Sequence, residues 1–463
     1  MTRFVSVDHD TPMLLPPDLR HWVPDNHMVH FVMDAIKVLK LDDAKLNIRG
    51  TGSAQYPPSM MLGLLIYCYA TGTFSSRKIE QLSHDSVAVR YLCAQHHPDH
   101  DSICKFRRDN GKLLESSFHQ VLECAARTKF LKVGNITLAV DGTKILANAS
   151  KHSAVSHGHA VEQMQLLADE ISQLVAKAEA ADSAPLQDGL SIPDEIKRRA
   201  ERIDKLQQAV SAIEKLAAAR TGVEKAEHEA LLKERAEKEQ STGKRPRGRA
   251  PKPPVEGPRE GDQFNFTDSE SRIMKVGTGQ FEQSYNAQAA VEIESRLIVA
   301  KHVTQEANDK QQLEPTLGVV SPVVEQIAKV LVDNGYYSQA AIEAVENHSE
   351  GPLQSAEILV ATKRHRHGRS VAELEQRDDP SAPCETATHK EKMEHRLDTQ
   401  AGRELYAQRK QTIEPVFGII KAAMGFRMFS LRGQAKVSLE WTLVTLSYNL
   451  KRLFHAGAKL QGA

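Results

Sequence analysis

The sequence predicts a mixed fold, with a helical N-terminal part followed by an α/β domain that a long helical segment interrupts. Short amphipathic stretches, separated by capping residues and tight turns, fill residues 1–130. Two apolar runs, 136–140 and 330–332, are each followed directly by an aspartate, a pattern typical of strands that carry a site in an open α/β sheet. Between these runs, residues 162–238 are rich in Ala, Glu, Lys and Leu, which indicates long helices.

Bulk composition restricts the class of protein. The length of 463 residues predicts about three domains. There are 60 Lys and Arg residues and 60 Asp and Glu residues, so the formal net charge is zero. A net charge of zero is a mild argument against a nucleic-acid binder, although local clusters of charge matter more. The longest apolar run, 60–70, is too short to span a bilayer, and the N-terminus has no apolar signal core. We therefore expect a cytoplasmic protein without a membrane partner.

The helical domain at 1–130 has several predicted helix starts, including Pro57-Pro58 and Ser75. Arg107 and Arg108 form a basic pair within the last long helical stretch. This pattern fits a helix-turn-helix-like reader of DNA ends, and it fits a plain helical bundle with a solvated basic turn equally well.

The first strand of the α/β domain is expected within residues 131–147 and carries Asp141. Residues 150–240 then predict an inserted helical hairpin, because apolar residues approximate a heptad seam at Ile203, Leu206 and Val210. A break at 185–193 separates the two helices. Dimerisation and a solvated arm without a partner are both consistent with this pattern.

A basic linker, residues 241–262, follows the hairpin. Its centre has Gly248 between Arg247 and Arg249, as in an AT-hook, in which an extended backbone lies on the floor of a narrow minor groove. A Pro-rich disordered linker has a similar composition.

The sheet is expected to resume at residue 264. Residues 285–292 and 297–304 predict an antiparallel hairpin, 313–327 a helix, and 328–333 a strand that ends in Asp333. Ser338 begins the next helix, and a fifth strand is expected at 357–362. A polar loop insertion, 363–400, begins with a basic run.

Residues 406–421, YAQRKQTIEPVFGIIK, predict an amphipathic helix. Lys410, Glu414 and Lys421 fall close to one face, an arrangement that suits joint binding of a metal ion and a polyanion. A salt-bridged surface helix is the ordinary alternative. Pro415 is expected to bend or restart the helix.

Residues 425–433, GFRMFSLRG, interleave aromatic residues with Arg427 and Arg432. Contact with a DNA end and packing under the catalytic domain are both consistent with this segment. A closing helix at 437–454 has leucines at helical spacing and is expected to belong to the core.

Two strand-borne aspartates followed by a helix-borne glutamate resemble the DDE transposases of bacterial insertion sequences, which have a ribonuclease-H-like catalytic domain. The resemblance covers most of the chain outside 163–239 and is closest to the group with a Tyr–Arg–Glu–Lys signature. It rests on VDGTKI (140–145), RIMK (272–275), YNAQAAV (285–291), VDNGYYS (332–338) and IEPVFGIIK (413–421). The chain departs from the signature at one place, because four residues rather than three separate Arg409 from Glu414. Lys410 has the family's spacing to Glu414.

The resemblance implies a five-stranded mixed sheet, formed by residues 131–147 and 264–463, and a DNA transposase that binds terminal inverted repeats, cuts DNA and joins the ends to a target. The implied catalytic residues are Asp141, Asp333, Glu414 and Lys421, and the three acids would hold two Mg²⁺ or Mn²⁺ ions. Double-stranded DNA and a second copy of the chain are the expected partners. The expected DNA contacts are Tyr406, Arg409, Lys410, Arg247, Arg249, Arg107, Arg108, Arg427 and Arg432.

Other classes of protein remain as alternatives. A transposase-derived DNA-binding protein without cleavage activity would keep the same fold. Another ribonuclease-H-like nuclease, acting for example on RNA hybrids, would keep the acids. A structural coiled-coil scaffold would explain the helical insertion but not the acid-bearing strands.

Overall fold

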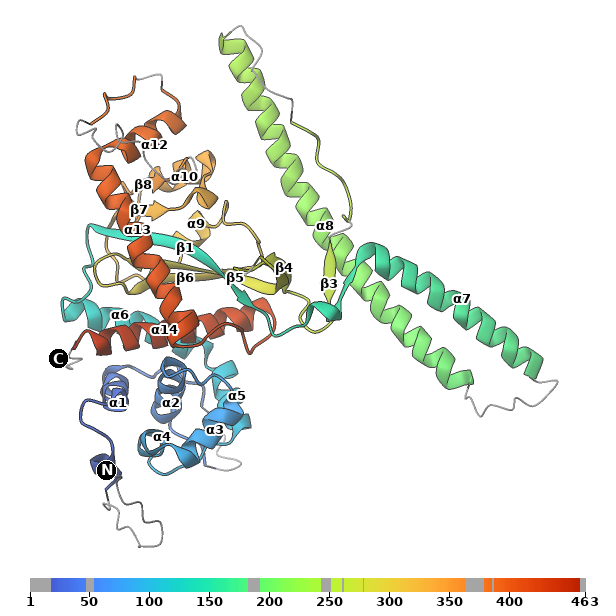
Figure 1. The fold of residues 1–463 in the computed structure, drawn as a ribbon, viewed down its shortest axis with the longest axis horizontal. Helices are drawn as coiled ribbons and strands as arrows, with labels where there is room; N and C mark the ends of the chain where they lie inside the picture. The colour runs from blue at the N-terminus through green and yellow to red at the C-terminus, as the bar shows by residue number, and fades with distance from the viewer. Residues whose placement is uncertain are drawn as a thin grey trace, which may run out of the picture. The chain divides into compact units, whose positions relative to one another are not determined.

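The computed structural model describes residues 18–46, 54–181, 192–242, 251–259, 262–277, 279–362, 379–384 and 387–458 (Figure 1). Arg247 and Arg249 of the AT-hook-like linker, and the basic run after residue 362, lie outside these ranges. The chain divides into two compact units, residues 1–146 with 285–463, and residues 147–284, and each is described by itself. No helix in the described ranges is both long and apolar enough to cross a membrane.

The first unit begins with a group of short helices. The Ser86 and Asp99 side chains accept hydrogen bonds from the backbone N–H groups of Val89 and Ser102, which caps two of these helices. The last long helical stretch of this domain, which contains Arg107 and Arg108, is divided into two helices at Asn110. The helices are η1 (Leu19–Trp22), α1 (Met28–Val38), α2 (Pro58–Ala70), α3 (Ser76–Asp85), α4 (Val87–Leu92), α5 (His100–Asp109) and α6 (Gly111–Arg127).

The sheet has the neighbour order β6–β5–β1–β7–β8, with β4 (Arg272–Lys275) also paired to the start of β5. As predicted, β5 and β6 form an antiparallel hairpin. The strand β7 pairs in parallel with β1. Counting β4, the sheet is six-stranded rather than five-stranded. The other strands are β1 (Ile136–Leu146), β5 (Phe281–Glu292), β6 (Ile298–Thr304), β7 (Ile327–Val332) and β8 (Glu357–Val360).

The helices of the α/β part differ from expectation at one place. The helix predicted for 313–327 is a single short turn, α9, because it ends at Gly318 and Pro322 follows. The closing helix α14 is buried along most of its length and packs against β6, α2 and α6, as expected of core. The helical segments are α9 (Leu313–Leu317), η3 (Asn334–Tyr336), α10 (Gln339–Glu346), α12 (His389–Asp398), α13 (Gln400–Gly418), the π turn η4 (Ile419–Ala423) and α14 (Gln434–His455).

The second unit contains two long helices, α7 (His157–Ala181) and α8 (Ile192–Thr242), that lie side by side (Figure 1). Leu167 of α7 packs with Leu206 and Val210 of α8, which are seam residues. Near their base are η2 (Lys151–Ser153) and a small sheet of β2 (Ala154–Ser156) with β3 (Gln263–Asn265). After α8 the chain returns along that helix, and Arg259 forms an ion pair with Glu224 at 2.7 Å.

Candidate active site

Two aspartates mark the centre of the sheet. The β1–β7 pairing aligns Leu138 with Val330 and Ala139 with Leu331. Continuing the same register by two residues sets Asp141 opposite Asp333, and paired strands lie about 4.8 Å apart. The backbone therefore brings the two predicted catalytic acids together, although 192 positions separate them in the sequence.

The proximity of these acids changes their chemistry. The Asp141 side chain is 22% exposed. Burial, together with the nearby charge of Asp333, raises the pKa of Asp141 to about 7, although the Arg409 guanidinium acts in the opposite direction. Asp333 also accepts a hydrogen bond from the backbone N–H of Gly335, which fixes the turn after β7. A pair of carboxylates that disfavour joint ionisation is a suitable binding site for a hard divalent cation.

Arg409 lies inside the protein, where sequence reasoning expected a DNA contact. Its side chain is 8% exposed, and its Nη1 lies 3.4 Å from Asp141 Oδ2. The residue is on the face of α13 that packs against β1. The charge of Arg409, a residue expected to contact DNA, is therefore directed at an acid of the protein in this structure.

Tyr406 is also directed inward. Its hydroxyl donates a hydrogen bond to the backbone carbonyl of Val332 at 2.9 Å, and its ring packs beside Leu331 and Leu359. Val332 immediately precedes Asp333, so Tyr406 anchors the end of the strand that carries this acid. An internal acceptor already occupies the hydroxyl that was expected to contact DNA.

Pro415 does not interrupt α13, which runs through it to Gly418 and continues as a π turn. The expected restart is therefore wrong, and the wide turn begins four residues later.

Lys421 lies within this π turn, and its Nζ donates to the backbone carbonyl of Lys144 on β1 at 2.8 Å. Burial lowers the pKa of Lys421, and the positive charges of Lys144 and Arg427 add to this effect.

Glu414 is exposed, as is Lys410. Glu414 is five residues beyond Arg409, a rotation of about 140° around the helix axis, so it leaves the face that Arg409 shares with Ile413. The extra residue in the signature accounts for this displacement. Among the described residues, no three His, Cys, Asp or Glu side chains are arranged to hold a metal ion. The structure thus pairs Asp141 with Asp333 but does not bring Glu414 into a three-ligand set with them.

Arg107 and Arg108 are adjacent and have different surroundings. Arg108 is exposed, whereas Arg107 is 3% exposed. The Arg107 Nη1 donates to the Tyr69 hydroxyl at 2.7 Å and to the Phe74 carbonyl at 3.0 Å. The Tyr69 hydroxyl donates in turn to Glu440 of α14 at 3.1 Å. The guanidinium of Arg107, a residue expected to contact DNA, is therefore held by partners in the interior.

Residues 427–429 lie beside the end of β1. Leu146 donates its N–H to the Arg427 carbonyl at 3.1 Å and accepts from the Phe429 N–H at 2.9 Å. Arg427 and Arg432 are exposed, whereas Phe426 and Phe429 are fully buried. Of the two possibilities for this segment, the buried aromatic rings agree with packing under the catalytic domain, and the two arginines face solvent.

Sequence reasoning missed a polar cluster beside Asp141. Asp309, in the loop after β6, accepts hydrogen bonds from the side-chain amides of Asn286 and Gln288, each at 2.7 Å, and lies 3.4 Å from Lys144 Nζ. Its charge is a minor cause of the raised pKa of Asp141. A signal was present, because Asn286 and Gln288 alternate on one face of an otherwise apolar strand, where buried amides require partners.

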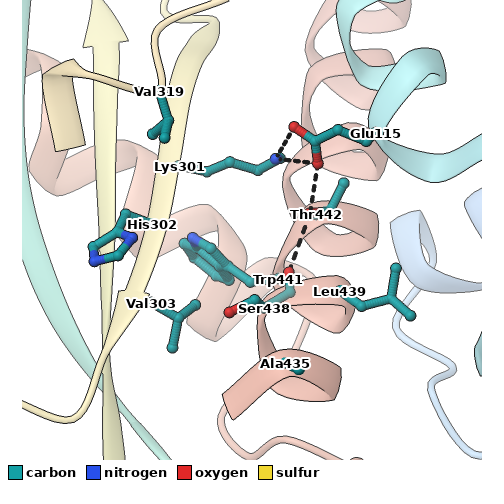
Figure 2. A pocket seen from close by; sticks show the side chains of 10 residues that line it. All are labelled: Glu115, Lys301, His302, Val303, Val319, Ala435, Ser438, Leu439, Trp441 and Thr442. Carbon is teal, nitrogen blue, oxygen red and sulfur yellow. Dashed lines mark hydrogen bonds and ion pairs between the residues drawn. The ribbon is translucent and has the colours of Figure 1, made fainter. Parts of the chain in front are cut away.

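A cavity of about 290 Å³ lies elsewhere in the same unit, between α6, β6 and α14 (Figure 2). It contains the ion pair of Lys301 with Glu115, at 2.7 Å, and one wall is Trp441. None of the predicted catalytic residues lines it. We therefore assign the candidate site to the acid pair and not to this cavity.

Two family models match the chain. The model described as "Transposase DDE domain" matches residues 376–454, and the model described as "Transposase domain (DUF772)" matches residues 17–109. The first range contains α13, with Arg409, Glu414 and Lys421, whereas Asp141 and Asp333 lie outside both ranges. No curated protein and no solved structure matched the chain.

One matched range contains the N-terminal helices α1 to α5, and the other contains the helix that directs Arg409 at Asp141. A transposase of this kind is an enzyme that cuts nucleic acid, and its partner is DNA. The chain thus contains two ranges that match transposase models, and both support an insertion-sequence DDE transposase.

Proposed function

We propose that the protein binds the terminal inverted repeats of its own insertion sequence, cuts DNA at the repeat boundary, and joins the freed 3′ ends to target DNA. The observation behind this proposal is the pairing of Asp141 with Asp333 next to the helix of the matched DDE domain. The strand order β6–β5–β1–β7–β8, with β7 beside β1, is the order expected of a ribonuclease-H-like fold and supports the proposal.

DDE transposases generally use divalent metal ions, and the donor set here fits such an ion. Asp141 and Asp333 are carboxylates, the ligands that Mg²⁺ and Mn²⁺ prefer, and their mutual repulsion would be relieved by a cation. Glu414 is proposed as the third acid and would have to turn toward the pair. Two bound ions would supply Lewis-acid activation of the attacking oxygen and charge neutralisation at the scissile phosphate.

The chain's own residues would hold and orient the DNA phosphate. In each step an oxygen of water or of a DNA 3′-OH forms a bond to phosphorus, and the bond from phosphorus to the leaving 3′ oxygen breaks. Lys421 uses one N–H on the Lys144 carbonyl and retains two for phosphate oxygens. Arg409 limits the pKa of Asp141, so that less of this carboxyl is protonated at neutral pH.

DNA contacts away from the acids are assigned to exposed cations. Arg108, Lys410, Arg427 and Arg432 are exposed and would contact backbone phosphates. Arg247 and Arg249 are proposed to enter a minor groove. A homodimer is proposed because two ends have to be brought together before joining.

A cleavage assay tests the proposal. Purified protein is incubated with linear DNA carrying the inverted repeats that flank its gene, in Mg²⁺ or in EDTA. We expect metal-dependent nicking at the repeat boundary that Asp141→Ala, Asp333→Ala and Glu414→Gln abolish while repeat binding persists. Glu404→Gln is the matched control, because Glu404 is another exposed glutamate of α13. Wild-type cleavage by any of the three acid variants contradicts the role assigned to that acid.

A transposase-derived DNA-binding protein that no longer cuts is the second candidate. The observation in its favour is the exposed position of Glu414, outside any three-ligand group of the described residues. Tight repeat binding without cleavage in either Mg²⁺ or Mn²⁺ would select this function.

A further inference from the structure

The loop after β6 contains a carboxylate that the proposed function does not use. Asp309 Oδ1 accepts hydrogen bonds from Asn286 Nδ2 and Gln288 Nε2, both at 2.7 Å. Asn286 and Gln288 are fully buried on β5. Asn286 Nδ2 also donates to the Glu306 carbonyl at 3.0 Å, and Gln288 Nε2 also donates to Asn286 Oδ1 at 3.1 Å. These bonds join the loop to the strand.

The cluster lies directly over the backbone next to Asp141. A Cβ atom added to Gly142 would lie 2.2 Å from Gln288 Nε2 and 2.6 Å from Asp309 Oδ1. Both distances are well inside van der Waals contact, so β1 approaches the cluster this closely only because residue 142 has no side chain. The position of the Gln288 amide therefore limits where the Asp141 backbone can lie.

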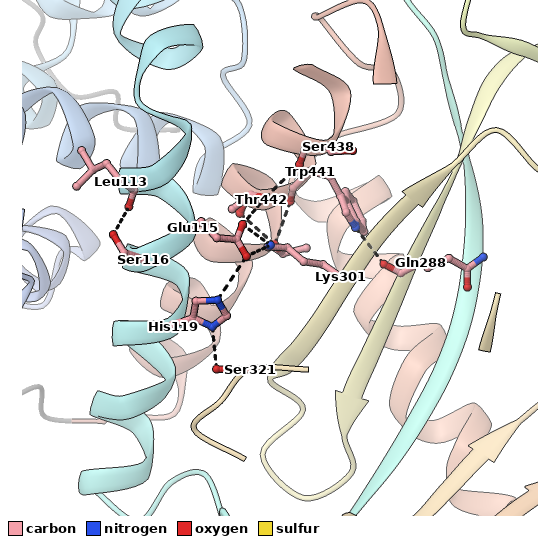
Figure 3. Close-up of polar contacts among 11 residues, drawn as sticks. Leu113, Glu115, Ser116, His119, Gln288, Lys301, Ser321, Ser438, Trp441 and Thr442 are labelled. Atoms are coloured by element: carbon pink, nitrogen blue, oxygen red, sulfur yellow. Dashed lines mark hydrogen bonds and ion pairs between the residues drawn. The ribbon is translucent and has the colours of Figure 1, made fainter. Parts of the chain in front are cut away.

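The same amide also reaches the segment that carries Asp333. Tyr336, fully buried in η3 three residues after Asp333, donates its hydroxyl hydrogen to Gln288 Oε1. Gln288 thus contacts both acid-bearing segments, with its nitrogen side near Gly142 and its oxygen side on Tyr336. On the other side of the strand, the Trp441 indole N–H donates to the Gln288 backbone carbonyl at 3.1 Å (Figure 3).

We propose that Asp309 is a positioning residue that fixes the orientation of the Gln288 amide and, through it, the relative position of Asp141 and Asp333. An ionised carboxylate only accepts hydrogen bonds, so Asp309 requires the NH₂ group of Gln288 on its side. The carbonyl oxygen of Gln288 must then face the Tyr336 hydroxyl. An asparagine at 309 would offer both a donor and an acceptor, and the Asn286 Oδ1 acceptor alone would then hold the Gln288 NH₂ group in its present orientation.

This inference rests on the proposed function only in the identity of the acid pair. Partners that orient metal-binding side chains typically change metal affinity about 10- to 100-fold when they are mutated. We therefore expect Asp309→Asn to weaken Mn²⁺ binding by about that factor. Mn²⁺ binding, measured by calorimetry on the full chain without DNA, is independent of cleavage.

Glu292→Gln is the matched control. Glu292 is a carboxylate on the same strand, 2% exposed, that accepts from the Ser295 N–H at 2.7 Å and from its hydroxyl at 2.6 Å, on the side of a hairpin turn. Both substitutions replace a hydrogen-bonded carboxylate by an amide and should lower the thermal unfolding temperature. Only Asp309→Asn should weaken Mn²⁺ binding, and Asp141→Asn should weaken it at least as much.

The outcomes separate the two proposals. Unchanged Mn²⁺ affinity in Asp309→Asn, equal weakening in Glu292→Gln, or no Mn²⁺ binding by the wild-type chain would each overturn the positioning role. Weakened binding in Asp309→Asn alone would support it. Failure of the wild-type chain to cut repeat DNA would overturn the proposed function, whereas the Mn²⁺ series would still decide the role of Asp309.

Discussion

The Arg409 guanidinium and the Asp141 carboxylate face each other inside the protein, with Nη1 3.4 Å from Oδ2. They join α13, in the matched DDE domain, to the first strand of the sheet. The arginine is oriented toward Asp141, where its charge lowers the pKa of this acid. This geometry leads to opposite expectations for Arg409 and its exposed neighbour Lys410.

Arg409→Met should change the pH dependence of cleavage. The Arg409 charge lowers the pKa of Asp141, so its loss should raise this pKa further above about 7 and reduce metal binding at neutral pH. We expect the cleavage rate at pH 7 to fall about tenfold and to recover partly at higher pH, since one pKa unit is a tenfold change in proton affinity. The measurement is the rate of repeat nicking across pH 6–9 at fixed Mg²⁺.

Lys410→Met serves as the control for this prediction. Lys410 is exposed and one residue further along α13, so its loss should weaken DNA binding at low salt without moving the pH profile. If Arg409→Met and Lys410→Met gave the same salt-dependent loss of binding and no change with pH, the assignment of Arg409 to Asp141 would be wrong.

Asp141→Asn should stabilise the metal-free protein at alkaline pH. The pKa of Asp141 is about 7 in the folded protein, mainly because of burial and then because of the Asp333 charge. In the unfolded chain it is about 4. The folded state therefore holds this proton more tightly, and its contribution to the free energy of unfolding is lost as the pH rises from about 4 to about 7.

The measurement is urea unfolding in EDTA at pH 5 and pH 8. Asparagine cannot ionise, so the variant should gain a few kcal/mol over the wild type between these pH values, on the order that linkage predicts for such a shift. Equal pH dependence in both proteins would show that Asp141 ionises freely in the fold.

The two aspartate-bearing strands could be predicted because their signal is local. Each is a short apolar run that ends in a single acid, and the preference for right-handed crossovers then makes them neighbours. Arg107 could not be predicted in the same way. A basic dipeptide ordinarily faces solvent, and its burial depends on Tyr69, 38 residues earlier, and on Glu440 beyond it.

Glu414 and Asp309 illustrate two further limits. The one extra residue between Arg409 and Glu414 was visible in the sequence, but its consequence depends on which helix face packs on β1. Asp309 lies in a polar loop, and its importance arises only from contacts with Asn286 and Gln288, more than 20 positions away. Local patterns cannot supply such long-range pairs.

Replacement of Arg107 should cost stability, whereas replacement of its neighbour should cost DNA affinity. Arg107→Met removes donors to the buried Tyr69 hydroxyl and the Phe74 carbonyl, with an expected loss of about 3 kcal/mol in the free energy of unfolding. Arg108→Ala should change stability by less than about 0.5 kcal/mol. Urea denaturation and a salt titration of repeat binding distinguish the two, and a stable Arg107→Met protein would contradict the buried role.

Gly142→Ala should disturb the acid pair because no space exists for a methyl group. The nearest atom, Gln288 Nε2, would lie 2.2 Å from the new carbon, so the amide would have to leave its bonds to Asp309 and Tyr336. We expect at least a tenfold loss of Mn²⁺ affinity, by analogy with other lost orienting contacts. Gly222→Ala is the control, because a methyl group there meets nothing within 4 Å.

The double variant Gly142→Ala/Asp309→Asn extends this test. Both changes act on one amide, so their effects on Mn²⁺ affinity should overlap and the double variant should lose little more than Gly142→Ala alone. Gly222 lies in α8, away from these residues in the chain. Gly222→Ala should therefore raise the free energy of unfolding slightly, and by the same amount in the wild type and in Asp309→Asn. Strict additivity of Gly142→Ala with Asp309→Asn would mean that the two residues reach the acid pair by separate routes, contrary to the role proposed for Gln288.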